Sequence, residues 1–395
     1  MKRFFALGLA TALLIALLAA CAAKPKGNEY PFAERNGMMD SELRESPDGY
    51  YLRRGDYLWF TERETMDTLV VCTRFDCLHD AELRTDKRED CLAFFANPRG
   101  TGEYFFFENG KLYLFTRSVT LSDSHRHVYS LIEAAPDGTE RRTLYDFPDD
   151  IQVVGAILHR GVFYIASRVF DETGKSHYSL YSLPLNGKKP ELLQDFKDVD
   201  VQSMSLTAHG DYLYYTSSVM TGGEFRVGLY RLDLRTKKVT EIPPESPDRP
   251  WLLPAFHGDR LLLTGEGYDP AARKSVVCLY DCAPDGTDRR QVLEGDNLNL
   301  WTDGEYLYAW TMMLSGEEHN VLSILDMEGR ELDRVELDKI PETQKDAMLW
   351  CVVPTAGDRA LLVMQGADGD EQYYCWFAKS DIGSGNIIPA LYFRK

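Results

Sequence analysis

A glycine-led motif that recurs at a nearly constant spacing constrains the fold of this chain more than any other feature. Seven times a glycine, usually followed by aspartate or another polar residue, begins a short run of aromatic or aliphatic residues. These glycines are Gly55, Gly110, Gly161, Gly210, Gly258, Gly304 and Gly357, and successive ones are 55, 51, 49, 48, 46 and 53 residues apart. A repeat of this length is typical of solenoids, propellers and other arrays of one supersecondary unit.

Each repeat contains about four short segments rich in Tyr, Phe, Leu, Ile and Val, separated by turn residues, which predicts β-strands. The clearest repeat predicts strands over Val201–Ala208, Tyr212–Ser217, Val227–Leu234 and Val239–Ile242. Four strands per unit are typical of a propeller blade. We therefore predict an all-β fold, a β-propeller of seven four-stranded antiparallel blades. Six or eight blades are the alternatives, because the first repeat, near Pro47–Asn97, is the least regular.

Two kinds of turn recur in phase with these strands. The seven glycines are expected between the first and second strands of each blade, because tight hairpin turns need the positive φ that glycine adopts freely. The segment Ala135–Arg142 recurs almost unchanged at Ala283–Arg290, and both contain Pro-Asp-Gly-Thr. Asn186-Gly187 and Glu328-Gly329 occupy the equivalent place in two further repeats. These segments predict turns between the third and fourth strands.

The first residues predict export. A basic start, Met1–Arg3, precedes the apolar run Phe4–Leu17, which is too short to favour a permanent transmembrane helix. The run ends in Leu18-Ala19-Ala20-Cys21, which resembles the lipobox of bacterial lipoproteins. The resemblance implies a signal peptide over 1–20, a lipid on Cys21, and attachment to the extracytoplasmic face of the cell membrane. The alternative is an ordinary secretory signal with a coincidental cysteine.

The domain organisation follows from the repeat and the N-terminus. Residues 21–46 read as the lipidated cysteine and a polar tether, and residues 47–395 as one propeller domain. The net charge of −18 argues against nucleic acid as a partner and against a basic surface lying on anionic lipid. Solubility of an exported domain accounts for this charge. We expect a monomer.

Three cysteines and a histidine cluster in the first repeat. Cys72, Cys77, His79 and Cys91 are placed just after the predicted third strand of blade 1, in a polar insert over about 72–91. Thiolates and one imidazole make a chemically reasonable tetrahedral zinc site, whereas an exported protein is also a place where disulfides form. Three readings stay open: one disulfide with a spare thiol, a structural zinc ion, or free thiols.

The spacing of the other cysteines gives weaker predictions about disulfides. Eight cysteines less the lipidated Cys21 leave seven, so they cannot all pair within one chain. Cys278 and Cys282 read as small buried residues on one strand. Cys351 and Cys375 lie on two candidate strands of blade 7 and could pair if those strands are neighbours.

A search for catalytic motifs yields none. The sequence contains no Gly-x-Ser-x-Gly elbow, no His-Glu-x-x-His, no P-loop and no EF-hand loop. His125 and His127 could share one face of a strand, but a hairpin tip is the favoured interpretation. His209 and His257 precede the repeat glycine and read as turn positions. The catalytic residues, if there are any, stay unknown.

Several of these segments together resemble TolB-like β-propeller lipoproteins of anaerobic Gram-positive bacteria. The resemblance is carried by Leu18–Cys21, by Asp48-Gly49-Tyr50-Tyr51, by the run Cys72–Asp80 with Cys91, and by the Gly-Asp-Tyr-Leu-Tyr-type strand starts. It implies a surface-anchored propeller, and the family offers no established activity. We favour a binding or scaffolding module for a glycan, peptide or partner protein. The alternative is a carbohydrate-active hydrolase or lyase with a site at the central channel.

Overall fold

The computed structural model describes most of the repeat region. The described residues are 43–75, 77, 91–96, 104–118, 128–172, 175–187, 189–252, 254–271, 273–311, 321–340, 343, 347–366 and 371–394. All of them belong to the compact unit Phe32–Lys395. Cys21, His79, His125 and His127 lie outside the described residues, as does the predicted signal peptide.

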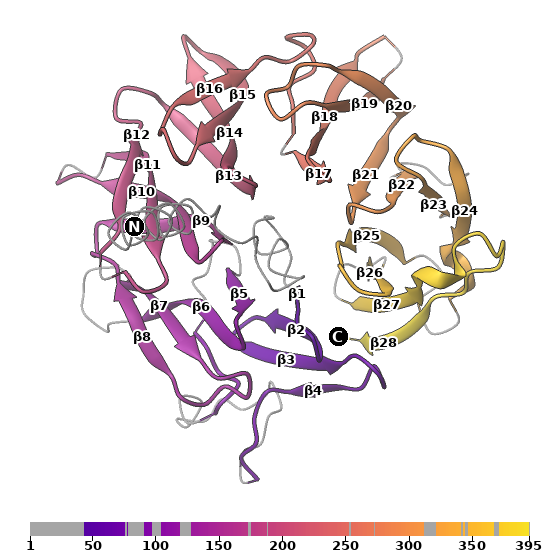
Figure 1. Cartoon of the computed structure of the whole chain (residues 1–395), viewed down its shortest axis with the longest axis horizontal. Helices are drawn as coiled ribbons and strands as arrows, with labels where there is room; N and C mark the ends of the chain where they lie inside the picture. Colours follow the sequence, from indigo (N-terminus) through magenta and orange to yellow (C-terminus); the bar gives the residue numbers. More distant parts are fainter. Residues whose placement is uncertain are drawn as a thin grey trace, which may run out of the picture. The chain divides into compact units, whose positions relative to one another are not determined.

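Seven four-stranded antiparallel sheets form a ring, so the predicted seven-bladed propeller is confirmed (Figure 1). Blade 1 consists of β1 (Leu43–Glu45), β2 (Gly49–Arg54), β3 (Tyr57–Glu62) and β4 (Thr68–Val70). Blade 2 consists of β5 (Phe105–Glu108), β6 (Lys111–Ser118), β7 (Val128–Ala134) and β8 (Arg142–Asp146). Blade 3 consists of β9 (Ile151–His159), β10 (Val162–Phe170), β11 (Ser176–Pro184) and β12 (Glu191–Asp195). Blade 4 consists of β13 (Val201–His209), β14 (Tyr212–Thr221), β15 (Glu224–Asp233) and β16 (Val239–Ile242).

The remaining three blades complete the ring. Blade 5 consists of β17 (Ala255–His257), β18 (Arg260–Asp269), β19 (Lys274–Cys282) and β20 (Arg290–Asp296). Blade 6 consists of β21 (Leu298–Thr302), β22 (Leu307–Thr311), β23 (Val321–Leu325) and β24 (Glu331–Glu336). Blade 7 consists of β25 (Met348–Val353), β26 (Arg359–Gln365), β27 (Gln372–Ala378) and β28 (Ala390–Arg394). Two 3₁₀ helices, η3 (Leu337–Lys339) and η4 (Lys379–Asp381), follow β24 and β27. Among the residues that the structure describes, none forms an apolar helix long enough to cross a membrane.

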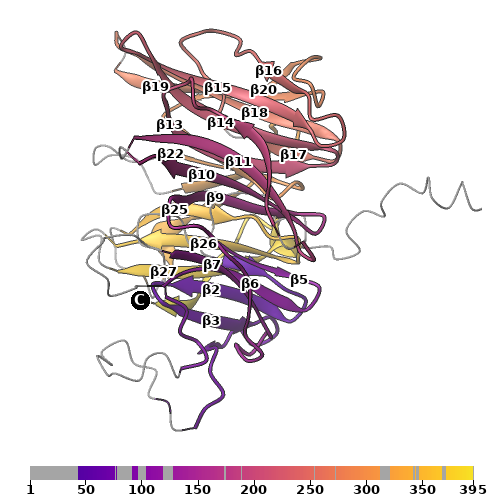
Figure 2. The same cartoon turned by 90° about the vertical axis from the view of Figure 1, so that its left-hand side faces the viewer.

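The inner strands carry unbroken apolar runs because each blade is covered on both faces by its neighbours. Every residue of β5 is buried, and five consecutive residues of β10 are buried, whereas β8 and β12 at the outer edge are partly exposed. The apolar clusters therefore lie between blades, as where Phe106 and Phe115 of blade 2 meet Phe163 of blade 3. Figure 2 views the ring from the side and shows the strands of neighbouring blades as successive layers.

The structure places the repeat glycines in turns, with two departures from the prediction. Six of the seven have positive φ, between +55° and +87°. Gly55 lies between β2 and β3, not between the first two strands of its blade, because Leu43–Glu45 supplies an additional inner strand. The predicted tether therefore extended too far, since its last residues form β1. Gly357 is the glycine without positive φ.

The predicted outer turns lie between the third and fourth strands of blades 2, 3, 5 and 6. In blade 2 the amide of Gly138 donates to the carbonyl of Ala135 at 2.9 Å, and the Asp137 carboxylate accepts from the backbone amide of Thr139 at 3.0 Å. The corresponding residues of blade 5 make the same two bonds. Identical local sequence therefore produces an identical turn 148 residues later.

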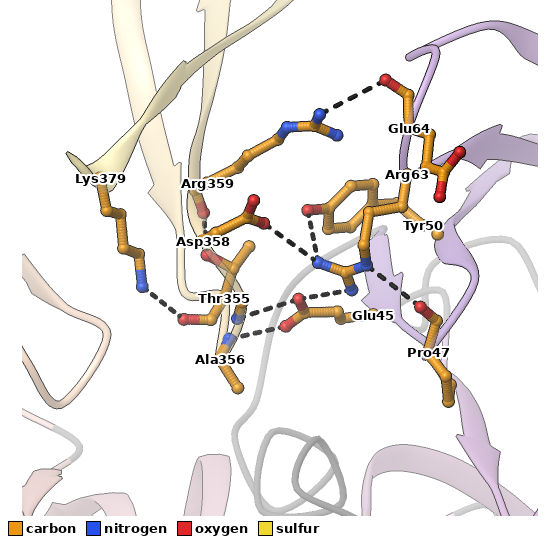
Figure 3. Close-up of polar contacts among 12 residues, drawn as sticks. Glu45, Pro47, Tyr50, Arg63, Glu64, Thr355, Ala356, Asp358, Arg359 and Lys379 are labelled. Carbon is orange, nitrogen blue, oxygen red and sulfur yellow. Dashed lines mark hydrogen bonds and ion pairs between the residues drawn. The ribbon is translucent and has the colours of Figure 1, made fainter. Parts of the chain in front are cut away.

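The ring closes between blade 7 and blade 1 through side chains. All four strands of blade 1 come from residues 43–70, and all four of blade 7 from residues 348–394. Glu45 of β1 accepts hydrogen bonds from the amides of Ala356, at 2.6 Å, and Gly357, at 3.1 Å, in the turn before β26. Arg63 binds the same carboxylate at 2.9 Å (Figure 3). A Cβ at Gly357 would overlap a guanidinium nitrogen of Arg63 and lie 2.7 Å from the Glu45 carboxylate, so a larger residue here would displace this pair.

Candidate functional site

A cavity of about 600 Å³ lies between blades 4, 5 and 6 and reaches β1. Its volume falls within the range of pockets that hold small molecules or short oligomers. Its walls come from β13 and β14 of blade 4, from β18, β19 and the segment before β17 in blade 5, and from β21 of blade 6. Blades 4, 5 and 6, together with β1 and Pro354 after β25, therefore build one concave surface.

The short first strand of blade 5 helps to open this cavity. β17 has three residues, whereas β13, the corresponding strand of blade 4, has nine. The chain before β17 instead crosses β18, where Trp251 forms an isolated bridge with Gly265 and the Leu252 amide donates to Thr264 at 2.8 Å. A Cβ on Gly265 would meet the Trp251 ring at 3.0 Å, so glycine lets the indole lie against the strand.

Hydroxyl groups dominate the polar part of the cavity wall. Alternate residues of β13 contribute one row, because side chains two apart on a strand share a face. The hydroxyl-bearing lining residues are Ser203, Ser205, Thr207, Thr216, Ser218, Thr264 and Thr302. The Ser203 hydroxyl donates to that of Ser218 at 2.9 Å, which links the two strands. The amide side chain of Asn299 and the indole of Trp301 line the cavity from β21.

The charged groups among the described lining residues are already engaged. Arg44 donates from Nε to the Phe105 carbonyl at 2.9 Å, and Glu45 belongs to the ring closure. Glu266 accepts a hydrogen bond from Ser275 at 2.9 Å. The wall thus offers neutral donors and acceptors beside apolar and indole surface, which suits an uncharged polar ligand.

A second cluster, of thiols, lies beside blade 1. The sulfur atoms of Cys72, Cys77 and Cys91 all lie within 4.8 Å of one another, and none of the three cysteines is in a disulfide. Cys72 follows the fourth strand of its blade, not the third as predicted, because β1 shifts the strand count by one. His79, the predicted fourth member, lies outside the described residues.

The three sulfurs perturb one another's ionisation. Burial disfavours the Cys72 thiolate, but hydrogen bonds from the backbone of Arg74 and Leu92 and from the other two thiols outweigh it, and the pKa of Cys72 is lowered. Burial also disfavours the Cys77 thiolate, and the nearby Cys91 and Cys72 sulfurs add to this effect. The pKa of Cys77 is therefore raised to about 12.

The remaining cysteines are also thiols. Cys278 and Cys282 are buried on β19, as predicted. Cys351 pairs with Val363 of β26, and Cys375 lies on β27, so the two cysteines occupy strands separated by β26. The predicted pairing of these two cysteines requires neighbouring strands, and their strands are not neighbours.

The histidines near the inner turns connect neighbouring blades. A ring nitrogen of His257 lies 2.9 Å from the Gly304 carbonyl of blade 6, and His159 makes the corresponding contact, 2.8 Å, with Gly210. His209 stacks on Phe256 with ring centroids 4.4 Å apart. These contacts agree with the interpretation of His209 and His257 as turn positions of the scaffold.

Sequence reasoning missed two arginines that join blades. Arg53 is fully buried and donates to the carbonyls of Phe115, at 2.9 Å, and Phe95, at 3.2 Å. Arg141, after the outer turn of blade 2, donates to the carbonyls of Leu92 and Phe94. The repeated Arg141-Arg142 and Arg289-Arg290 pairs in the sequence could have indicated this role. Arg289 donates to the Pro243 carbonyl, just after blade 4, at 2.7 Å, as Arg141 does to the segment after blade 1.

The alternation Ser203, Ser205, Thr207 was a signal for the cavity. Hydroxyls on one face of a predicted inner strand, opposite Met204 and Leu206, point to a polar wall. The sequence could not show which blade would face that wall, because the other lining residues come from distant segments, including Leu43–Glu45 at the start of the propeller and Pro354 in blade 7.

Several solved propeller structures are similar to this chain. One, from a study of two prolyl endopeptidases, aligns over 95% of this chain and 54% of its own, with a TM-score of 0.59 and 12% identity. An oligogalacturonate lyase in complex with manganese aligns over 86% of this chain and 88% of its own, with a TM-score of 0.51 and 11% identity. TolB from Acinetobacter baumannii aligns over 89% and 81%, with a TM-score of 0.32 and 16% identity. The likeness is one of fold.

The comparison with the prolyl endopeptidase covers about half of that protein. At these identities the two structures with TM-scores above 0.5 show the architecture and leave the activity open. A scan against protein-family models and a search of curated proteins found no match.

Proposed function

We propose that this protein is a lipid-anchored, extracytoplasmic binding module whose propeller takes up a glycan. The observation that carries the proposal is the cavity between blades 4, 5 and 6, with its wall of hydroxyl groups. Hydroxyl and amide side chains both donate and accept hydrogen bonds, as sugar hydroxyls do. A ligand that replaces water at such groups must satisfy each of them, which makes the wall selective.

The indole of Trp301 supports the same class of ligand. Trp301 is half-buried and borders the cavity, while Trp251 is 2% exposed and is fixed by a hydrogen bond from Nε1 to the Pro243 carbonyl at 2.9 Å. The accessible part of the Trp301 indole, beside the hydroxyl groups, provides apolar contact for the C–H face of a sugar ring.

The location of the protein is part of the proposal. The Leu18–Cys21 segment supports lipid attachment, and a multiply acylated cysteine is the kind of anchor that stable membrane binding needs. The anchored propeller would then present its cavity outside the cytoplasm. A peptide or a partner protein is the other ligand class for such a module.

The test is binding of the detergent-solubilised full chain to a glycan array, followed by calorimetry on the best ligand. Thr216→Val and Ser218→Ala remove single hydroxyls from the wall and should each weaken binding about 5- to 30-fold, since a lost hydrogen bond that leaves a partner group unpaired costs about 1–2 kcal/mol. Ser323→Ala, in blade 6 outside the lining, is the matched control and should bind normally.

Three outcomes decide between the alternatives. Glycan binding that the wall variants weaken supports the proposal. Binding to a peptide library without any glycan binding would show that the ligand is a peptide and would contradict the glycan proposal. Turnover of a polysaccharide, abolished by Glu266→Gln, replaces the binding module with the hydrolase or lyase alternative, for which Glu266 is the exposed carboxylate at the cavity.

A further inference from the structure

Three thiols from two separate segments converge at one point beside blade 1. Cys72 and Cys77 follow β4, and Cys91 begins the segment 91–96. Their sulfur atoms lie within 4.8 Å of one another in all three pairs. In a tetrahedral zinc site with Zn–S bonds of about 2.3 Å, the sulfurs lie about 3.8 Å apart. The observed separation thus needs a contraction of at most about one ångström.

Two of the three sulfurs are held by backbone that the blade itself fixes. Next to Cys72, the Val71 amide donates to the Leu58 carbonyl of β3 at 2.9 Å. Two residues after Cys91, the Ala93 carbonyl accepts from the Leu58 amide at 2.9 Å. β3 therefore positions both segments from the same residue, and the distance between Cys72 and Cys91 follows from the sheet.

Blade 2 holds the Cys91 segment from its other side. Arg141 donates to the carbonyls of Leu92 and Phe94 and lies 4.0 Å from the centroid of the Phe95 ring. Gly138, with φ of +79°, lies so close to Leu92 that a Cβ would overlap its carbonyl oxygen. The guanidinium also brings positive charge to the segment that carries Cys91, which suits a site where thiolates gather.

We propose that Cys72, Cys77 and Cys91 bind a zinc ion that joins the two segments to blade 1. A disulfide would use two of the sulfurs and leave the third, whereas a thiophilic divalent cation uses all three. Binding displaces the three thiol protons to solvent, and the Zn²⁺ complex with three thiolates carries a net charge of −1. The fourth coordination position goes to a further donor or to water. The role is structural, because the ion would cross-link the segment after β4 to the segment 91–96.

Metal analysis of the full chain tests the proposal. Protein purified without chelator should contain about one zinc per chain, and Cys72→Ser and Cys91→Ser should each lose most of it. Cys351→Ser, a half-buried cysteine of blade 7, is the matched control and should keep its zinc. Hydrogen exchange at residues 91–96 should speed up in the two cluster variants and stay unchanged in the control.

A second measurement avoids the question of whether a variant folds. The wild-type chain, stripped of metal under reducing conditions, should bind Co²⁺ and show the intense thiolate-to-cobalt charge-transfer absorption of a multi-thiolate site, which Zn²⁺ then displaces. A disulfide between any two of the three cysteines in the unreduced protein, found by peptide mass spectrometry without bound metal, would overturn the proposal. Absence of the cobalt spectrum in well-folded stripped protein would overturn it equally.

Discussion

Replacement of Glu45 by alanine should open the propeller at its closure. The Glu45 side chain is 1% exposed, and it accepts from Arg63 and from the amides of Ala356 and Gly357. Removal of one partner from a buried ion pair typically costs about 3–5 kcal/mol. Each backbone amide that loses a buried acceptor adds up to about 1–3 kcal/mol to the same loss, but Ala356 is exposed enough for water to replace the carboxylate.

The other hydrogen bonds of Arg63 reduce the loss of stability expected for Glu45→Ala. The Arg63 side chain is 19% exposed, and its guanidinium keeps bonds to the carbonyl of Ser46, at 2.8 Å, and to the hydroxyl of Tyr50, at 3.1 Å. We therefore expect Glu45→Ala to lower the free energy of unfolding by about 3–4 kcal/mol, near the lower end of that range. Glu45→Gln keeps one carbonyl acceptor in place and should lose less.

Urea denaturation combined with hydrogen-exchange mass spectrometry measures this loss and locates it. Protection should fall in β1, in β25 and in the turn before β26, while β13 and β14 keep theirs. Glu224→Ala, which breaks an exposed pair with Arg226, is the control and should change stability by less than about 0.5 kcal/mol. A loss below about 1 kcal/mol for Glu45→Ala, or one spread evenly over all blades, would refute the argument that this carboxylate closes the ring.

Three further outcomes follow from the structure. Gly138→Ala should destabilise the protein more than Gly210→Ala in urea titrations. Both glycines have positive φ, which costs an alanine about 1–2 kcal/mol, but only the Cβ at Gly138 would also overlap the Leu92 carbonyl oxygen, whereas the Cβ at Gly210 meets nothing within 4 Å. Equal urea midpoints of the two variants would contradict this. Lys379→Met should raise the unfolded fraction at a given temperature, since it removes the cation that lies 2.7 Å from the buried Asp303 carboxylate. Asp303 keeps hydrogen bonds from the Tyr308 hydroxyl and from two backbone amides, so we expect a cost near the lower end of about 3–5 kcal/mol; an unchanged melting curve would count against it. Cys21→Ser should abolish incorporation of radiolabelled fatty acid, and equal labelling of variant and wild type would rule out the lipobox interpretation.

The repeat was readable from the sequence because its signals are local. A glycine with positive φ and the strand that follows it depend on a few adjacent residues, so Gly161, Gly210 and Gly258 located their blades without knowledge of the neighbours. The Pro-Asp-Gly-Thr turns behave in the same way. A seven-bladed architecture follows from counting such signals, because every blade repeats one unit.

The first blade shows where local signals end. Leu43–Glu45 carries two charged residues and reads as tether, yet Arg44 and Glu45 are 5% and 4% exposed in β1. Their burial is stable because Phe105 of blade 2 and the turn of blade 7 supply partners. Those partners lie more than 60 and 300 residues away, so the strand exists because the ring closes on it.

The sequence by itself determined the blade and its turns and favoured seven blades, with six or eight as the alternatives. Tertiary structure decided what the blades enclose and how they join. The hydroxyl wall needs blades 4, 5 and 6 around one cavity, and the thiol cluster needs β3 to hold two segments side by side. The physical reason is range: backbone conformation responds to adjacent residues, whereas a cavity, a buried ion pair or a ligand set requires groups that only the completed ring brings within a few ångströms.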